Sequence, residues 1–308
     1  MNRRVAVAAI IGLIVFIVVA VIISQSKKGT NVVGEFKSEA STLYNTAVSL
    51  QSKGNVEEAV KLYQELVKKY PQDKRAADVW YRLAKVYAGS NLWTKAKEAY
   101  SNIIANFPNY ENIAEVEKNL WDANVKIIFS PIITEKDFTY SVQPGDTLGK
   151  IAAKHNTTVD LIMKSNNLDS AMIRVGKRLK LSTIKFSVIV DKSQNMLTLR
   201  ADDEIFKVYS VATGKYNCTP VGNFQVVEKL INPDWYKEGV GVVSADSPEN
   251  VLGTRWIGLS EPQYGIHGGA AEEDLGRQVT EGCVRMINTD VEELFTILPR
   301  GAEITIVD

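Results

Sequence analysis

YGIHGG at residues 264–269 and TEGCVRM at residues 280–286 are the two stretches that decide how the C-terminal part of the chain is understood. They contain His267 and Cys283, in a chain with two histidines and two cysteines altogether. A thiol with an ordinary pKa of about 8.5 is mostly protonated at neutral pH, so a nucleophilic cysteine needs a base or an electropositive neighbour. The pattern predicts that Cys283 is a nucleophile and that His267 is its general base.

Glycines surround both residues. His267 lies between Gly265 and Gly268, where the backbone can come close to a substrate. Gly282, directly before Cys283, permits a tight turn that exposes the sulfur and aims backbone N–H groups at a developing oxyanion. No Asp or Asn is marked by its spacing as a third catalytic member. We therefore expect a backbone carbonyl, that of Gly268, to fix the tautomer of the imidazole.

The sequence around these stretches alternates in the manner of β-strands. A capping box at Thr289-x-x-Glu292 predicts one helix, with Val291, Leu294, Phe295 and Leu298 facing inward. The pattern favours an antiparallel sheet assembly with few helices. The predicted strands cover residues 186–190, 196–200, 205–212, 223–229, 255–259 and 302–307.

Residues 185–308 resemble the L,D-transpeptidase catalytic domain from end to end. The resemblance rests on Thr213-Gly-Lys215, Thr219-Pro-x-Gly-x-Phe224, Asn232-Pro-x-Trp235, Leu252-Gly-Thr-Arg-Trp-Ile-Gly-Leu259 and the two stretches quoted above. It implies attack on the carbonyl of the third residue, meso-diaminopimelate or similar, of a tetrapeptide stem of peptidoglycan, with release of the terminal D-alanine. A thioester would follow, resolved by the amine of a second stem, of a protein or of a D-amino acid, or by water.

The same resemblance implies roles for individual residues. Cys283 would be the nucleophile, His267 the base, and the backbone near Gly282 and Cys283 the oxyanion hole. Arg285 is a candidate for binding a substrate carboxylate, with an internal salt bridge as the alternative. Trp256 and Tyr264 are candidates for lining the substrate groove, with a place in the core as the alternative.

The chain departs from the family at one position. Where the family usually has Ser-His-Gly-Cys, this chain has Thr280-Glu281-Gly282-Cys283. A carboxylate at this place raises the pKa of the thiol unless it is paired or points away. Arg285 and Arg277 are the candidate partners of Glu281.

Residues 138–182 resemble a LysM domain, a small βααβ module. The motif is Tyr140-x-Val-x-x-Gly-Asp-Thr-Leu148, followed by Ile151-Ala152, Asn166 and Leu179-x-Leu181. Asp146 or Thr147 is expected to cap the first helix and Thr158 the second. The resemblance implies binding of N-acetylglucosamine-containing glycans. His155 is expected to face solvent at a helix end.

Residues 37–126 contain an internal repeat that resembles tetratricopeptide repeats. Gly54 and Asn91 fall where a turn between two helices needs positive φ. The aromatic residues form either a core alone or a concave surface that docks a protein partner. Seven positions of the first unit recur 37 residues later in the second. The first unit has Tyr44, Ala47, Ala59, Tyr63, Leu66, Tyr70 and Pro71, and the second has Tyr81, Ala84, Ala96, Tyr100, Ile103, Phe107 and Pro108.

Residues 1–27 differ from the rest of the chain. Val5 to Ile23 is an uncharged apolar run preceded by Arg3 and Arg4, and roughly 20 such residues span a bilayer. This predicts a cytoplasmic tip and a single transmembrane anchor in the cell membrane, with the remainder facing the cell wall or periplasm. A cleaved signal peptide is the alternative.

The composition excludes some function classes. Lys+Arg and Asp+Glu are equal at 36 each, so no overall field attracts nucleic acid. Two histidines and no Cys-x-x-Cys give no metal-ligand spacing, and no cofactor is expected. Cys218 could pair with Cys283 in a disulfide that would block catalysis.

The sequence therefore predicts a multidomain protein with α-helical repeat hairpins, a βααβ LysM module and a mainly β catalytic domain. The predicted function is a membrane-anchored cysteine L,D-transpeptidase that remodels peptidoglycan, with carboxypeptidase activity where water is the acceptor. The alternative is a catalytically impaired wall-binding scaffold that recruits partners through its repeats. A papain-like protease does not fit, because the cysteine follows the histidine.

Overall fold

The computed structural model describes residues 29–237 and 239–308. The expected membrane anchor at residues 1–27 lies outside this range and stays a prediction. Within the described range, no helix combines the length and apolar character needed to cross a membrane. The chain divides into two units, one ending at Val116 and the other beginning at Glu117.

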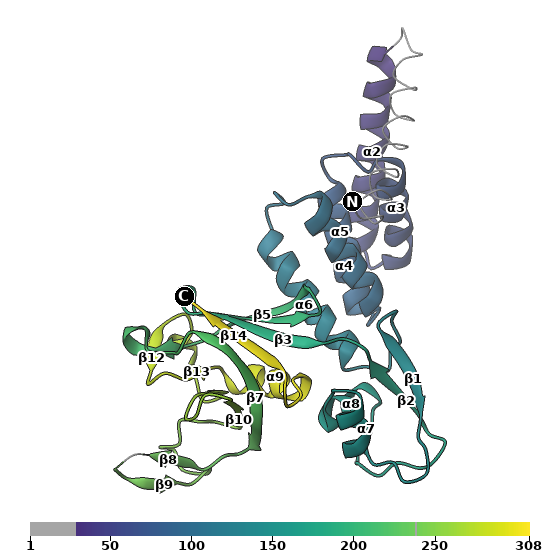
Figure 1. Cartoon of the computed structure of the whole chain (residues 1–308). Coiled ribbons are helices and arrows are strands. Elements are labelled where there is room, and N and C mark those ends of the chain that lie inside the picture. Colours follow the sequence, from purple (N-terminus) through teal and green to yellow (C-terminus); the bar gives the residue numbers. More distant parts are fainter. Residues whose placement is uncertain (1–28, 238) are drawn as a thin grey trace, which may run out of the picture. The chain divides into compact units, whose positions relative to one another are not determined.

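The first unit is built of helical hairpins (Figure 1). The helices are α2 (Gly29–Ser52), α3 (Val56–Lys69), α4 (Ala76–Gly89) and α5 (Trp93–Asn106). Gly54 and Asn91 have φ of 84° and 58°, as expected for the turns inside the two hairpins. The repeated residues Ala47, Ala59, Tyr63, Leu66, Ala84, Ala96, Tyr100 and Ile103 are buried in the core. The other repeated aromatic residues, Tyr44, Tyr70, Tyr81 and Phe107, are half-buried, so the docking surface stays a prediction.

Helix α6 (Ile113–Ile128) continues into the second unit, which next contains the LysM module. Its elements are β1 (Asp137–Ser141), α7 (Leu148–Lys154), α8 (Val159–Ser165) and β2 (Arg178–Ser182), and β1 pairs antiparallel with β2. The expected βααβ order is confirmed. Of the two expected caps for the first helix, Thr147 is the one used, since its Oγ1 accepts from the N–H of Lys150. Thr158 caps the second helix by accepting from the N–H of Leu161.

The prediction for His155 is only half right. It is the C-cap of α7, but its ring is half-buried and lies 5.4 Å from the ring centroids of both Phe138 and Tyr140. Burial lowers its pKa. The aromatic residues of β1 therefore cover an imidazole that the helix-end position alone would leave in solvent.

The rest of the second unit is a curled eight-stranded sheet around helix α9 (Asn288–Ile297) (Figure 1). The strand order is β13-β11-β10-β7-β14-β3-β4-β5. The predicted antiparallel sheet is corrected in two places, because β14 pairs parallel with β3 and β11 pairs parallel with β13. The bounds are β3 (Phe186–Asp191), β4 (Met196–Ala201), β5 (Glu204–Ser210), β7 (Gly222–Ile231), β10 (Arg255–Leu259), β11 (Gly265–His267), β13 (Val284–Arg285) and β14 (Glu303–Val307).

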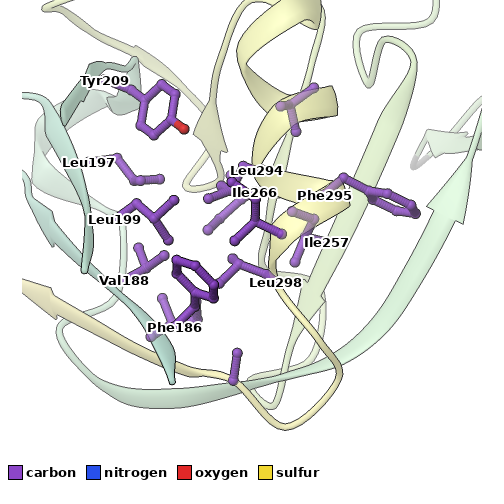
Figure 2. Packing of buried hydrophobic residues seen from close by; sticks show 14 of the residues in the cluster. Phe186, Val188, Leu197, Leu199, Tyr209, Ile257, Ile266, Leu294, Phe295 and Leu298 are labelled. Carbon is purple, nitrogen blue, oxygen red and sulfur yellow. The ribbon is translucent and has the colours of Figure 1, made fainter. Parts of the chain in front are cut away.

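Helix α9 packs its predicted inward face against this sheet (Figure 2). The apolar core includes Phe186, Val188, Leu197, Leu199, Ile257, Ile266, Val291, Leu294, Phe295 and Leu298. The predicted capping box at Thr289 is wrong. The N-cap position is Ile287, which forms no side-chain cap, and Thr289 already lies within the helix.

Two short strand pairs complete the second unit. Strand β6 (Thr213–Gly214) pairs parallel with β12 (Gln278–Thr280), and a 3-10 turn, η1 (Lys215–Asn217), follows β6 directly. Strands β8 (Trp235–Lys237) and β9 (Gly241–Val243) form a separate hairpin. A further 3-10 turn, η2 (Glu272–Asp274), lies between β11 and β12.

Candidate active site

His267 is the last residue of β11 and is 4% exposed. In the antiparallel pairing of β10 with β11 it lies opposite Trp256. The indole and imidazole rings are stacked, with centroids 5.9 Å apart and planes inclined by 26°. The strand and the indole together fix the position and plane of the imidazole.

The hydrogen bonding of His267 defines its tautomer. Its Nδ1 lies 2.8 Å from the carbonyl oxygen of the next residue, Gly268. A carbonyl can only accept, so Nδ1 carries the hydrogen and the lone pair of the neutral ring is on Nε2. This is the arrangement that a general base requires.

Burial lowers the pKa of His267 to about 4, because the charged imidazolium would lose its hydration. The carbonyl of Gly268 opposes this shift and the positive charge of Arg285 adds to it. The imidazole is therefore neutral at neutral pH.

Cys283 directly precedes β13, the strand that pairs in parallel with β11. The turn before it is held by Thr280, whose hydroxyl donates to the Cys283 carbonyl at 2.7 Å and accepts from the N–H of Gly282 at 3.2 Å. The thiol donates to the carbonyl of Gln263, with 3.6 Å between sulfur and oxygen. Burial raises the pKa of the thiol, so the resting pair is a neutral thiol and a neutral imidazole.

The glycines of the site make room for two aromatic rings. Gly282 has φ of 127°, and a Cβ there would lie 2.7 Å from a ring carbon of Tyr264. A Cβ on Gly265 would lie 2.6 Å from the indole of Trp256. Both rings are half-buried, so each packs on the backbone of the site while keeping an exposed part.

The comparisons with known proteins concern the domain that contains these residues. The model of the L,D-transpeptidase catalytic domain matches residues 185–306. YqjB of Bacillus subtilis is 42% identical over 127 residues, which cover 39% of this chain and 70% of that protein. YkuD of the same organism is 31% identical over 175 residues, which cover 54% of this chain and 98% of that protein, and the name of each reads "Putative L,D-transpeptidase".

This chain belongs to the L,D-transpeptidase family. Models of the LysM domain and of the tetratricopeptide repeat match residues 140–182 and, for the repeat, residues 41–73 and 78–110. Among solved structures, an L,D-transpeptidase from Mycobacterium smegmatis aligns with 44% of this chain and 65% of that chain, at 16% identity and a TM-score of 0.35.

Arg285 lies opposite His267 in the pairing of β11 with β13. Its Nη2 donates to Asp274 at 2.9 Å, so the internal salt bridge considered for it is present. Its Nε is buried and has no hydrogen-bond partner among the residues that the structure describes. The carboxylate-binding role of Arg285 stays a prediction.

Glu281 pairs with neither of the two arginines considered for it. Its carboxylate lies 2.9 Å from Nζ of Lys215, and its side chain is 90% exposed. Arg285 is bound to Asp274, and Arg277 donates to the carbonyl of Glu273. The carboxylate is thus both paired and solvated, two conditions that weaken its effect on the pKa of the thiol.

Asn288 is a residue of the site that sequence analysis missed. Its Oδ1 accepts from the N–H groups of Thr254 and Gly269, at 3.1 Å and 3.0 Å. A Cβ on Gly268 or on Gly253 would lie within 2.3 Å of that oxygen. Asn288 therefore ties the segment that carries the Gly268 carbonyl to the start of α9. The only sequence signal was an asparagine next to a predicted helix start.

Both cysteines are free thiols. A Cβ on Gly214 would lie 2.6 Å from the Cys218 sulfur and 3.0 Å from Cα of Gly282. Cys218 therefore lies close to the turn before Cys283, and its charge would raise the pKa of Cys283. Among the residues with described placement, no group of three His, Cys, Asp or Glu side chains could hold a metal ion.

Proposed function

We propose that this protein is a peptidoglycan-remodelling cysteine L,D-transpeptidase that acts on tetrapeptide stems through a thioester on Cys283. The observation that carries the proposal is the neutral imidazole of His267. Its Nδ1–H donates to the Gly268 carbonyl. His267 lies on β11, and Cys283 directly precedes the neighbouring strand, β13. Such a ring has its Nε2 lone pair free to take a proton from a nucleophile.

In the acylation step, the thiol turns from the Gln263 carbonyl toward His267 and gives its proton to Nε2. The sulfur attacks the carbonyl carbon of the third stem residue, so that an S–C bond forms. The C–N bond to the terminal D-alanine breaks, and the proton on Nε2 passes to the leaving amine. Hydrogen bonds of catalytic groups are often long before substrate binds, so the resting contact of the thiol with Gln263 is compatible with this step.

The tetrahedral intermediate carries a negative oxygen. The backbone N–H of Cys283, after the tight turn at Gly282, is our candidate donor to it. The exposed parts of Trp256 and Tyr264 would contact the stem, and Arg285 would bind a stem carboxylate through the donors that Asp274 does not use.

In the second step, the nitrogen of an acceptor amine attacks the thioester carbon. A C–N bond forms, the C–S bond breaks, and one N–H proton of the amine returns through His267 to the sulfur. Attack by water instead of an amine would give a tripeptide stem, which is the carboxypeptidase outcome. The thiol is regenerated in both cases.

The other parts of the chain would hold the catalytic domain at its polymer. The LysM module would bind the glycan, and the apolar run at residues 1–27 would anchor the protein in the cell membrane, with the catalytic domain facing the wall or periplasm. Attachment raises the effective concentration of stems near Cys283. A protein partner is proposed for the helical repeats.

The raised thiol pKa favours a second candidate, a wall-binding scaffold with an impaired site. The intact mass of the full-length protein, measured after incubation with a disaccharide-tetrapeptide under reducing conditions, separates the two. The enzyme gains the mass of the donor minus D-alanine, and Cys283→Ala does not. A protein that stays unmodified, with Cys283 inert to iodoacetamide, would favour the scaffold.

A further inference from the structure

Lys215 and Glu281 form an ion pair next to the nucleophile. They directly follow Gly214 and Thr280, which are partners in the parallel pairing of β6 with β12. The two side chains therefore extend from neighbouring strand ends and meet, with 2.9 Å between Nζ and Oε1. Glu281 is two residues before Cys283, so the pair lies beside the place where the thioester forms.

The turn that carries Lys215 is held firmly. The N–H of Gly214 donates to the hydroxyl of Thr219 at 2.8 Å. Buried Lys192 donates to the carbonyls of Asn217 and Thr219, at 3.2 Å and 2.9 Å. The backbone of this turn is thus fixed, and only the Lys215 side chain needs to move when a ligand arrives.

The ion pair itself is weak. The side chains of Lys215 and Glu281 are 49% and 90% exposed, and solvated pairs of this kind contribute little to stability. A ligand that offers a charge to each of them can replace their mutual contact at small cost.

An α-amino acid has an ammonium group and a carboxylate on the same carbon. Glu281 would accept hydrogen bonds from the N–H groups of the amino acid's amine. This holds for the charged ammonium group and for the neutral amine that remains after one proton is lost to solvent. Lys215 would bind its carboxylate. The amine would then lie next to Cys283, where it must be to attack the thioester.

We propose that Lys215 and Glu281 select the acceptor of the transfer step, favouring an amine whose carbon also bears a carboxylate over an isolated amine. The ligand class is an α-amino acid centre, free or at the end of a stem side chain. This inference rests on the proposed transpeptidase function and names the substrate class of its second step.

The test uses the full-length protein with a disaccharide-tetrapeptide donor and either D-methionine or D-methioninamide as acceptor. Masses of exchanged and hydrolysed products are measured, and each result is expressed as exchange relative to hydrolysis, so that any change in thioester formation cancels. Lys215→Met should lower the preference for D-methionine over its amide about 3- to 10-fold. Glu281→Gln should lower exchange with both acceptors by a similar factor.

The matched control is the exposed ion pair of Lys136 with Asp202, at 3.0 Å. Lys136→Met and Asp202→Asn should keep the wild-type preference. If Lys215→Met showed the same preference for D-methionine over its amide as Lys136→Met, this inference alone would be overturned. The proposed function would stand, because D-alanine release would continue. Absence of D-alanine release by the wild-type protein would overturn both the inference and the proposed function.

Discussion

His267 lies directly opposite Arg285 in the parallel pairing of β11 with β13. Cys283 lies two residues before Arg285 and directly precedes β13. The pairing thus brings the strand of His267 next to the strand that follows Cys283, although these two residues are 16 positions apart in the sequence. It also places the charge of Arg285 where it disfavours protonation of the imidazole.

The first prediction concerns pH. Because the pKa of His267 is lowered to about 4, the base stays neutral well below the ordinary histidine value of about 6.5. We expect the acid limb of kcat/KM for D-alanine release to lie near pH 4. A limb near pH 6.5 would contradict the buried, neutral imidazole.

An NMR titration of His155→Gln would observe His267 alone, since the chain has two histidines. Stability gives a second readout. Between pH 6.5 and about 4 the unfolded chain binds a proton at this residue that the folded chain does not. The free energy of unfolding should therefore decrease as pH falls through this window.

The second prediction concerns Asn288 as a positioning residue. Asn288→Ala leaves the N–H groups of Thr254 and Gly269 without their acceptor and loosens the segment that holds the Gly268 carbonyl. We expect kcat for D-alanine release to fall about tenfold, which corresponds to roughly 1.4 kcal/mol, with a smaller change in KM. The conservative variant Asn288→Asp keeps the acceptor oxygen and should recover most of the rate. Equal losses in both variants would argue against positioning through this oxygen.

The third prediction concerns Gly282. A methyl group there would meet the Tyr264 ring at 2.7 Å, on a backbone with φ of 127° that side chains rarely adopt. Gly282→Ala should therefore displace Cys283 and reduce D-alanine release by about 100-fold or more, on the order of 2.7 kcal/mol. The control is Gly149→Ala in α7, where a Cβ would meet nothing closer than 3.9 Å. If both variants keep wild-type rates, the tight turn is not needed.

The fourth prediction concerns the fold around the LysM module. Lys180 and Asp137 are 3.5 Å apart, with side chains 3% and 2% exposed. Lys180→Met would leave a buried carboxylate without its counter-charge, a change that typically costs about 3–5 kcal/mol. We expect faster hydrogen exchange across β1 and β2.

The double variant Lys180→Met with Asp137→Asn removes both charges and should recover most of this protection. Lys177→Met changes an exposed lysine close to the same strand and serves as the control. Unchanged exchange in Lys180→Met would show that the ion pair does not stabilise the β1–β2 pairing.

Much of this architecture follows from patterns within short stretches of sequence. Alternation predicted β3, β4 and β7, and the repeat of small and aromatic residues predicted the helical hairpins with turns at Gly54 and Asn91. These features depend on residues close in sequence, whose geometry a local pattern fixes.

Features that depend on pairing between distant segments could not be predicted in this way. The parallel pairing of β11 with β13, the contact of Glu281 with Lys215 and the hydrogen bonds of Asn288 each join segments separated in the chain. The false capping box at Thr289 has the same cause. Its sequence fits a helix start, but the neighbouring Asn288 is engaged by Thr254 and Gly269, and the N-cap is Ile287, two residues before Thr289.

Acyl transfer on peptidoglycan stems by Cys283 and His267 is the reaction that we propose. The most direct test incubates the full-length protein with disaccharide-tetrapeptides under reducing conditions, beside Cys283→Ala, and measures product masses. We expect cross-linked dimers that lack one D-alanine, or tripeptide monomers where water is the acceptor, and neither product with the variant. Unchanged tetrapeptide with folded wild-type protein, or the same products from Cys283→Ala, would contradict it.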